Sequence, residues 1–376
     1  MNVKRKPGAK RSTGRLVLAA LLCLGACLQQ ACQSPQSGPS EYHVGFSNLE
    51  LDHTGPEGGN ETLTAAVWYP TAQEPHPFTY GNGFESTVAR DAIPYRDQAP
   101  YPLIVFNHGL YSSKLSCLAL TEHLARQGFI VIAPDYLDAA APDFIEQATA
   151  RKIQGETELT NPVDTVRALA DLQALANAGH EAIVSYIEQF RLRKASFVID
   201  SMLTLNQDRS SAFHGLVDSS AIGMAGHSLG GLTTLGLIGA YDEVSINDDR
   251  IRAALIMSAP DPFREGIGHV SIPIMIMHGD IDLPSLVPLA ETLYAKAQAA
   301  RFYMVIRLAT HFTFGNAPCQ NHDSIPQCQR NDEHVRLING YATAFFARYL
   351  KHDIQAEEEL QRSNLMLSRY DRELRQ

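Results

Sequence analysis

The sequence predicts an α/β fold with a mostly parallel sheet and helices on both of its faces. Short, nearly continuous apolar runs alternate with amphipathic helical patterns from Leu103 onward. Such runs are typical of parallel strands, which crossover helices bury on both faces. The chain has 376 residues, of which 45% are hydrophobic, so it is long enough to bury one large core.

The chain begins with a segment that has the features of an export signal. Six basic residues and no acidic residue precede the apolar run Leu16–Ala26: Lys4, Arg5, Lys6, Lys10, Arg11 and Arg15. This run is about half of the roughly 20 residues that a membrane-spanning helix needs. We therefore expect residues 1–26 to be a signal peptide.

The end of this leader resembles a bacterial lipobox, in which a cysteine becomes the lipidated first residue of the mature chain. The residues are Leu24-Gly25-Ala26-Cys27, and the polar stretch that follows, within 27–40, would be a tether. Ordinary cleavage near Ala26 or Ala31 is the alternative. We expect an exported, membrane-anchored lipoprotein, periplasmic or at the cell surface, in preference to a freely secreted protein.

Removal of the leader makes the chain more acidic. It changes the formal net charge from −10 to −16, because the leader carries six positive charges and no negative one. An acidic surface disfavours nucleic acid and anionic membranes as partners. No nucleic-acid partner is expected, and the oligomeric state stays open.

Residues 41–376 are expected to form one catalytic domain. Val44–Leu51 and Leu63–Tyr69 have strand character and should open the sheet as an antiparallel pair. Pro70–Pro102, rich in proline and glycine, is expected to be irregular. The buried strands should be Leu103–Phe106, Phe129–Ala133, Ala221–Ala225, Ala253–Met257, Ile274–Met277 and Phe302–Ile306, and the helices that cover them Leu115–Arg126, Leu229–Tyr241, Leu286–Ala299 and Glu333–Leu350.

The stretch Asp135–Asp218 is too long for a single crossover. It carries two helical patterns, Pro162–Ala178 and Glu181–Leu205. We expect a helical insertion here, placed before the motif described next. It would either roof the active site or serve as additional packing.

A nucleophile motif follows the third buried strand. In Gly226-His227-Ser228-Leu229-Gly230 a strand runs into Ser228 and a helix starts directly after it. The strand-to-helix turn is so sharp that only glycine fits two residues before and after the serine. This context predicts that Ser228 is a catalytic nucleophile, lifted above the carboxyl ends of the strands.

A serine hydroxyl needs a base and an acid that orients it, in the chain order Ser, Asp, His. The strand that ends in His278 leads into a loop with two carboxylates, Asp280 and Asp282. Either could be the orienting acid. Asp282 is preferred because its Gly-x-x-Asp spacing matches the pattern of the family that the chain resembles, described below, and Asp280 would instead bond the turn backbone.

His311 is the expected general base. It lies in the loop after the strand Phe302–Arg307 and follows the acid in the chain. His322 and His334 also come later, but neither follows a sheet strand directly.

An oxyanion hole would complete the site. One donor is expected to be the backbone N–H of Leu229, at the start of the helix. The second is expected from the loop Asn107-His108-Gly109-Leu110-Tyr111, as the N–H of Leu110 or, alternatively, of Tyr111.

The chain has six cysteines. Cys23 and Cys27 lie in or at the end of the leader, and the other four are Cys32, Cys117, Cys319 and Cys328. Cys319 and Cys328 are close in sequence and should form a disulfide in an oxidising compartment. A zinc site of Cys319, His322, Cys328 and His334 is the alternative. Cys117 is expected to be a buried small hydrophobe.

Together these segments resemble the bacterial platelet-activating-factor acetylhydrolase and predicted dienelactone hydrolase group, itself similar to cutinase-like polyester hydrolases. The resemblance rests on Ala66–Pro70, Tyr101–Leu110, Gly226–Gly231 and the later Asp and His. It implies an α/β-hydrolase fold and a Ser-Asp-His esterase without a metal or cofactor, acting on short-chain or lipid-derived acyl esters. True dienelactone hydrolases use a cysteine nucleophile, so Ser228 departs from that reaction.

The sequence therefore predicts a carboxylic-ester hydrolase whose substrate is a small-molecule or lipid ester. Two alternatives stay open: an amidase or peptidase with the same triad, and a surface lipoprotein that binds a ligand without turnover. Fold-level resemblance does not transfer the substrate class.

Overall fold

A mixed sheet runs through the described part of the chain, which in this computed structural model comprises residues 41–54, 60–110, 112–136, 180–242, 244–259, 270–282 and 286–374. Its 11 described strands lie in the order β11-β10-β9-β8-β7-β5-β6-β2-β1-β4-β3. Their bounds are β1 His43–Thr54, β2 Asn60–Thr71, β3 His76–Thr79, β4 Glu85–Arg90, β5 Tyr101–Asn107, β6 Ile130–Pro134, β7 Val217–His227, β8 Ile251–Met257, β9 Ile274–Gly279, β10 Arg301–Ile306 and β11 Leu367–Glu373.

The centre of the sheet is parallel, and most pairs toward its edges are antiparallel, with the exception of the short parallel pair β1–β4. Neighbouring strands from β6 through β5, β7, β8 and β9 to β10 pair in parallel. The pair β1–β2 is antiparallel, β2 pairs antiparallel to β6, and β11 pairs antiparallel to β10. The carboxyl ends of the central strands therefore share one edge, where ligands bind in open α/β sheets.

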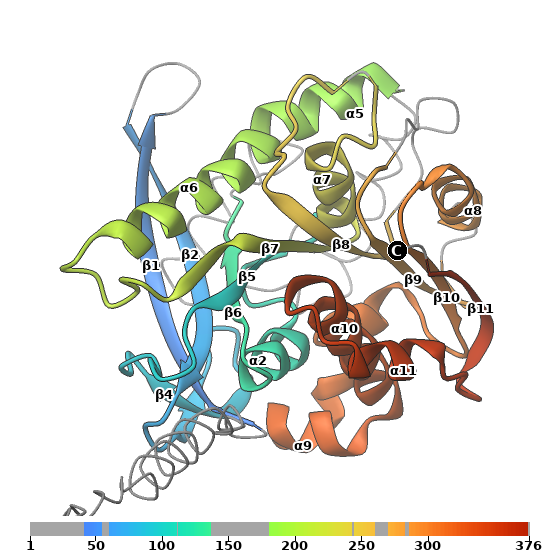
Figure 1. Cartoon of the computed structure of the whole chain (residues 1–376). Coiled ribbons are helices and arrows are strands. Elements are labelled where there is room, and N and C mark those ends of the chain that lie inside the picture. The colour runs from blue at the N-terminus through green and yellow to red at the C-terminus, as the bar shows by residue number, and fades with distance from the viewer. Residues whose placement is uncertain are drawn as a thin grey trace, which may run out of the picture. The chain divides into compact units, whose positions relative to one another are not determined.

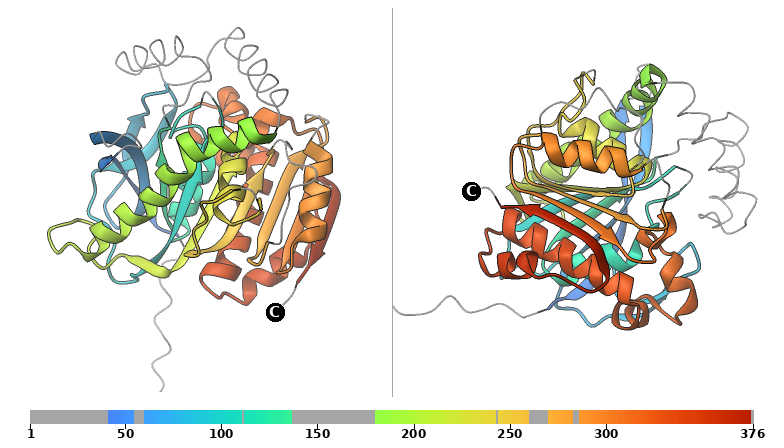
Figure 2. Two further views of the ribbon diagram at one scale, coloured as in Figure 1. Left: turned by 90° about the horizontal axis from the view of Figure 1, so that it is seen from above. Right: turned by 90° about the vertical axis from the view of Figure 1, so that its right-hand side faces the viewer.

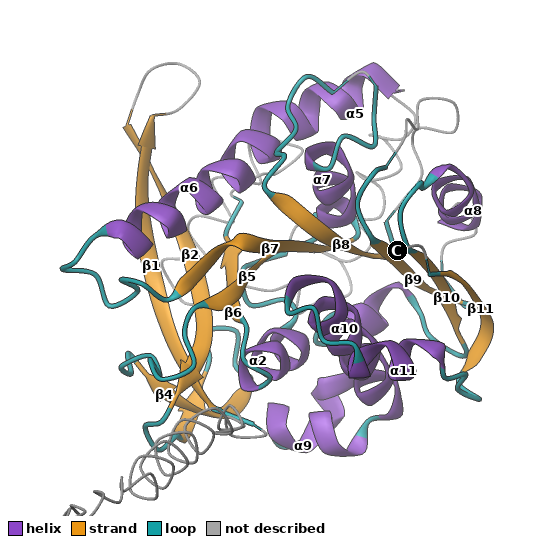
Figure 3. Cartoon of the chain, in the orientation of Figure 1, coloured by secondary structure: helices purple, strands orange, loops and turns teal. Residues whose placement is uncertain are grey.

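Helices cover both faces of this sheet, as Figures 1 and 3 show. Helices α5, α6, α7 and α8 lie on one face, and α2, α9, α10 and α11 lie on the other (Figures 1 and 2). Their bounds are α2 Leu118–Arg126, α5 His180–Ile187, α6 Arg193–Gln207, α7 Leu229–Leu237, α8 Leu286–Lys296, α9 Ile325–Asn331, α10 Glu333–Leu350 and α11 Gln355–Gln361.

The side chains of β5 explain why both faces need a cover. Leu103 and Val105 belong to the apolar cluster under α6 and α7, whereas Ile104 and Phe106 belong to the cluster under α2 and α10. Successive residues of a strand point to opposite faces, so an uninterrupted apolar run builds two cores at once.

The predicted fold class is confirmed: the sheet is mostly parallel, helices cover both faces, and the architecture is that of the α/β-hydrolases. All six predicted buried strands form, and so does the antiparallel opening pair. Glu333–Leu350 is helical over the range predicted.

Two expectations about the fold were wrong or incomplete. The passage Pro70–Pro102, expected to be irregular, contains the antiparallel hairpin β3–β4. The edge strand β11 and the short helices α9 and α11 were not predicted. Both β3 and β11 are edge strands with mostly exposed or half-exposed residues, so they lack the apolar runs that identified the buried strands.

Part of the predicted helical insertion is visible. Its second pattern forms one continuous helical rod made of α5, the π-helical turn η1 (Glu188–Leu192) and α6. The first pattern, Pro162–Ala178, lies outside the described residues, as do the leader, Cys27, the tether and Tyr111. None of the described helices is long and apolar enough to cross a bilayer.

Candidate active site

Ser228 stands at a strained turn between β7 and α7. Its backbone has φ 56° and ψ −124°, a left-handed conformation that a residue with a side chain adopts only when its surroundings enforce it. Its N–H donates to Met257 O at 2.9 Å, at the end of the neighbouring strand β8. The side chain is 5% exposed.

The glycines on either side of Ser228 allow this turn. A Cβ on Gly226 would lie 2.0 Å from Gly230 O, and a Cβ on Gly230 would lie 1.9 Å from Asn107 O. Both distances are far below van der Waals contact, so the two glycines are required by close backbone approach, as the sequence indicated.

The loop after β5 lies against Ser228. A Cβ on Gly109 would be 3.2 Å from the Cβ of Ser228, so the peptide that joins Gly109 to Leu110 is next to the predicted nucleophile. Leu229 is the first residue of α7, where backbone N–H groups have no partner within the helix. The two predicted oxyanion donors thus come from segments that meet at Ser228.

Asp282 contacts His311. The Oδ1 atom of Asp282 is 3.1 Å from Nδ1 of His311. Its Oδ2 atom accepts a hydrogen bond from Ser258 Oγ at 2.5 Å, and the Gly279 N–H lies 3.4 Å from the same oxygen. The carboxylate is therefore held on one side by donors and faces the imidazole with the other.

Asp280, the alternative acid, has a different partner. Its Oδ1 atom accepts a hydrogen bond from the Leu308 N–H at 2.7 Å, and its side chain is exposed. It serves the turn backbone, the ordinary role of aspartate in loops.

His227, inside the predicted nucleophile motif, connects this motif to the predicted base His311. Its Nε2 lies 2.9 Å from His311 O, and the two imidazole rings are 4.8 Å apart. Burial, followed by the neighbouring His311, lowers the pKa of His227 to about 3. The ring is therefore neutral near pH 7, and its Nε2–H donates to the carbonyl.

Within the described residues the Ser228 hydroxyl makes no hydrogen bond to the imidazole of His311. Hydrogen bonds between a nucleophile and its base often become short only in the complex with substrate. What the structure brings together is the Asp282–His311 pair and, through His227, the start of the nucleophile turn.

Ser258 was not singled out from the sequence. It directly follows β8 and has φ 46°, and strained residues of this kind cluster at functional sites. Ser228 and Leu308 also have positive φ, at the ends of β7 and β10. The position of Ser258 directly after a buried strand is a signal shared by many loop residues, so its bond to Asp282 became visible only in the folded chain.

The three cysteines in the described ranges form the predicted disulfide and one buried thiol. Cys319 and Cys328 form a disulfide with their Cα atoms 5.2 Å apart, which leaves no thiolate for the alternative zinc site. His334 instead contacts Arg307 O at 2.7 Å. Cys117 is 5% exposed, and its thiol donates to Phe314 O.

No group of three or more His, Cys, Asp or Glu side chains in the described ranges is arranged to hold a metal ion.

The chain is similar in sequence to platelet-activating factor acetylhydrolases. A sequence profile of the family described as platelet-activating factor acetylhydrolase, isoform II, matches residues 77–260. This range contains the Gly109–Leu110 loop and Ser228 but ends before Asp282 and His311. The acid and base are therefore supported by their contacts and not by that match.

Two relatives carry the name platelet-activating factor acetylhydrolase. The protein of Canis lupus familiaris is 24% identical over 257 residues, which cover 59% of this chain and 54% of the relative. That of Cavia porcellus is 26% identical over 268 residues, which cover 63% of this chain and 58% of the relative. The chain thus spans little more than half the length of these curated relatives.

A solved structure supports the fold. The ferulic acid esterase from Streptomyces cinnamoneus aligns with a TM-score of 0.54 at 19% identity, over 90% of this chain and 95% of that one. The structural neighbour supports the α/β-hydrolase fold, and the profile and the relatives show that the chain is similar in sequence to platelet-activating factor acetylhydrolases.

Proposed function

We propose that this protein hydrolyses carboxylic esters, with Ser228 as nucleophile, His311 as general base and Asp282 as the acid that orients the imidazole. The observation that carries the proposal is the 3.1 Å contact between His311 and Asp282 at the ends of neighbouring strands. His227, which contacts His311, directly precedes Ser228, and Ser228 has the positive φ of a strained turn. The esterase relatives support the reaction class.

The reaction would proceed in two halves. His311 accepts the proton of Ser228 as Oγ bonds to the ester carbon, and the tetrahedral oxyanion is stabilised by the N–H groups of Leu229 and Leu110. Collapse breaks the bond to the alkoxide, which leaves with the proton from His311 and yields an acyl-enzyme. A water molecule, deprotonated by His311, then attacks the acyl carbon. The bond between this carbon and Ser228 Oγ breaks, His311 returns the proton to Oγ, and the acid is released.

Within this mechanism Asp282 keeps one imidazole nitrogen protonated and stabilises the charged ring. The bonds from Ser258 and the Gly279 N–H hold the carboxylate in the required orientation.

A serine substitution tests the proposal directly. Wild-type protein should hydrolyse short p-nitrophenyl esters and react with a fluorophosphonate probe, and Ser228→Ala should lose both while keeping its circular-dichroism spectrum and melting temperature. Hydrolysis that persists in Ser228→Ala would contradict the assignment of Ser228 as the nucleophile. Failure of wild type to react with the probe would favour the ligand-binding alternative.

The choice between ester and amide substrates is open to a parallel measurement. An amide isosteric with the best ester should be turned over far more slowly, and the reverse order would favour an amidase or peptidase.

We further propose short-chain or lipid-derived acyl esters as the substrate class, because the named relatives act on a platelet-activating factor. A panel of graded acyl length that includes phospholipid and polyester substrates, run with wild type and Ser228→Ala, distinguishes these classes. Equal rates on soluble esters, with no response to micelles, would count against a lipid substrate.

Export as a lipoprotein is a separate proposal and rests on the leader sequence alone. In bacterial cells the full chain should incorporate labelled palmitate and fractionate with membranes, and Cys27→Ala should lose the label. Labelling that survives this substitution would contradict lipidation at Cys27.

A further inference from the structure

Arg191 is a fully buried arginine that none of the catalytic roles proposed above uses. It lies in the π-helical turn η1 of the insertion and is 0% exposed. A buried charge is costly unless it is paired or hydrogen-bonded, so its partners indicate what it does.

The guanidinium of Arg191 binds two consecutive carbonyls of the loop after β5. Its Nη1 donates to His108 O at 2.5 Å and its Nη2 lies 3.2 Å from Gly109 O. The guanidinium carbon stands 4.7 Å from the centre of the Tyr136 ring. This planar fork has two fixed donor directions, which a lysine cannot reproduce.

The second of these carbonyls belongs to the peptide that supplies the proposed oxyanion donor. In a trans peptide the C=O and the following N–H point in opposite directions. A hydrogen bond that holds Gly109 O toward Arg191 therefore turns the Leu110 N–H away from Arg191. Gly109 itself lies against Ser228, because a Cβ atom added to Gly109 would be 3.2 Å from the Cβ of Ser228.

A histidine supports the same carbonyl from within the loop. His108 Nδ1 lies 2.7 Å from Gly109 O, and the Tyr136 N–H donates to His108 Nε2 at 3.0 Å. Because Nε2 accepts, Nδ1 carries the proton and donates to Gly109 O. A carbonyl oxygen has two lone pairs, and Gly109 O accepts one hydrogen bond from Arg191 and one from His108. These two bonds polarise the peptide group and strengthen its N–H, that of Leu110, as a donor.

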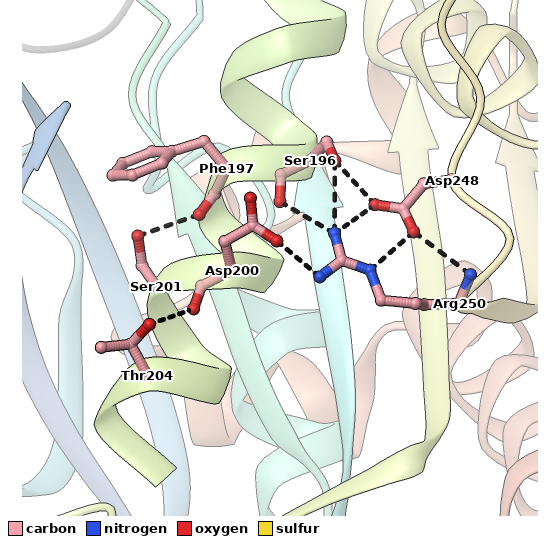
Figure 4. A network of polar contacts seen from close by, with 7 residues as sticks. All are labelled: Ser196, Phe197, Asp200, Ser201, Thr204, Asp248 and Arg250. Carbon is pink, nitrogen blue, oxygen red and sulfur yellow. Dashed lines mark hydrogen bonds and ion pairs between the residues drawn. The ribbon is translucent and has the colours of Figure 1, made fainter. Parts of the chain in front are cut away.

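The helical rod that carries Arg191 is itself anchored. Figure 4 shows Arg250 between the side chains of Asp248 and Asp200, with Ser196 bonded to Asp248. Burial alone would raise the pKa of Asp248, but the hydrogen bonds from Arg250 and Ser196 outweigh it and leave that pKa below its usual value. These bonds tie α6, one to three turns after Arg191, to the segment that precedes β8.

We propose that Arg191 is a positioning residue that fixes the oxyanion-hole peptide of Gly109 and Leu110, and thereby that the insertion completes the catalytic site. The inference rests on the proposed esterase function. It assigns to the insertion a specific task, which neither roofing nor extra packing describes. The π-helical turn is consistent with it, because such turns recur at functional sites.

The experiment compares Arg191→Met and Arg191→Lys with Arg348→Met as matched control. Arg348→Met removes the same type of side chain from an ion pair with Glu357, between α10 and α11 on the other face of the sheet. For each protein, KM and kcat are measured with p-nitrophenyl acetate, and kcat is calculated per active site titrated with a fluorophosphonate. Inhibition by a trifluoromethyl ketone is measured as well, because Ser228 would add to its carbonyl and form a tetrahedral oxyanion.

Arg191→Met should lower kcat per titrated site by about 10- to 100-fold, somewhat less than the loss of an oxyanion donor itself. KM should change little, and the affinity for the ketone should fall by a similar factor. Arg191→Lys should recover part of both losses, because an ammonium group bonds one carbonyl at a time. Arg348→Met should leave kcat per site and ketone affinity within about 2-fold of wild type, as for substitutions outside the site.

A merely structural Arg191 would give a different result. Fewer titratable sites or a lower melting temperature, with kcat per site and ketone affinity unchanged, would overturn the inference. If Arg191→Met does not fold, Arg191→Lys decides, and wild-type values of both quantities in that variant refute the proposal. If wild type fails to react with the fluorophosphonate, both the proposed esterase function and this inference are refuted. If wild type reacts, the results for the Arg191 variants test the inference alone.

Discussion

At the scale of single residues, two aspartates at the end of β9 illustrate how the same side chain takes different roles two positions apart. Asp282 contacts His311 and accepts from Ser258. Asp280 accepts from a backbone N–H across the turn. Only the contact with His311 links a carboxylate to the proposed base.

Substitution of the two aspartates should separate them. Asp282→Asn should lower kcat by about 100-fold or more, because the amide cannot hold the correct imidazole tautomer or stabilise its charged form. Asp280→Asn keeps an acceptor oxygen for the Leu308 N–H, so kcat should stay within about 2-fold of wild type. Steady-state ester hydrolysis checks both, and equal losses in the two variants would contradict the assignment.

At the scale of elements, the segments after β10 secure the loop that carries His311. The 3-10 helices η2 (His311–Phe314) and η3 (Ala317–Asn321) lead into α9. Asn316 accepts from the Leu118 N–H at 2.9 Å and donates to Leu115 O at 2.6 Å, which ties this segment to the start of α2. The disulfide Cys319–Cys328 then closes η3 onto α9.

Removal of this disulfide should cost stability and leave catalysis nearly intact. The two cysteines are 9 residues apart in sequence, and closing a loop of this size restricts the unfolded chain by about 2 to 3 kcal/mol. Cys319→Ala/Cys328→Ala should lower the free energy of unfolding by that amount, measured with urea, while kcat at 25 °C is retained. Wild type with its disulfide reduced is the control. A double variant as stable as the oxidised wild type would show that the link contributes nothing.

At the scale of the whole described structure, the proposed site draws on the carboxyl ends of five strands that are neighbours in the sheet. In sheet order these are β10, β9, β8, β7 and β5, which lead into His311, Asp282, Ser258, Ser228 and the Gly109–Leu110 loop. Because the strands are parallel, segments far apart in sequence meet at one edge.

The face of the sheet that α2 covers has a buried carboxyl group that links the stability of the folded state to pH. Glu122 in α2 is fully buried and accepts from Tyr80 at 2.8 Å and from Ser86 at 2.7 Å. Burial raises the pKa of Glu122 to about 7, and these hydrogen bonds offset only part of that rise. The folded state therefore holds a proton that the unfolded state has lost between about pH 4.5 and pH 7.

Because the folded state binds more protons in this window, stability falls as the pH rises through it and levels off above the folded pKa. Between pH 5 and pH 8 the loss from this group should be about 2 to 3 kcal/mol. Glu122→Gln has no such proton to lose, so its free energy of unfolding should fall less with pH than that of wild type. Urea titrations of both proteins at the two pH values measure the difference, and parallel pH dependences would refute it.

The sequence by itself determined the buried strands, the antiparallel opening pair, the nucleophile turn and the disulfide partners. Each depends on local information, such as an uninterrupted apolar run, glycines two residues from a serine, or two cysteines close together. Tertiary structure alone decided which aspartate meets His311, that Ser258 bonds to this aspartate, and that Arg191 reaches the loop of His108 and Gly109. Arg191 is separated from its acceptor Gly109 by 82 positions, and the edge strands β3 and β11 likewise depend on a neighbour across the sheet. Such contacts leave no periodic trace in the chain, because they are specified by how the elements pack and not by the residues beside them.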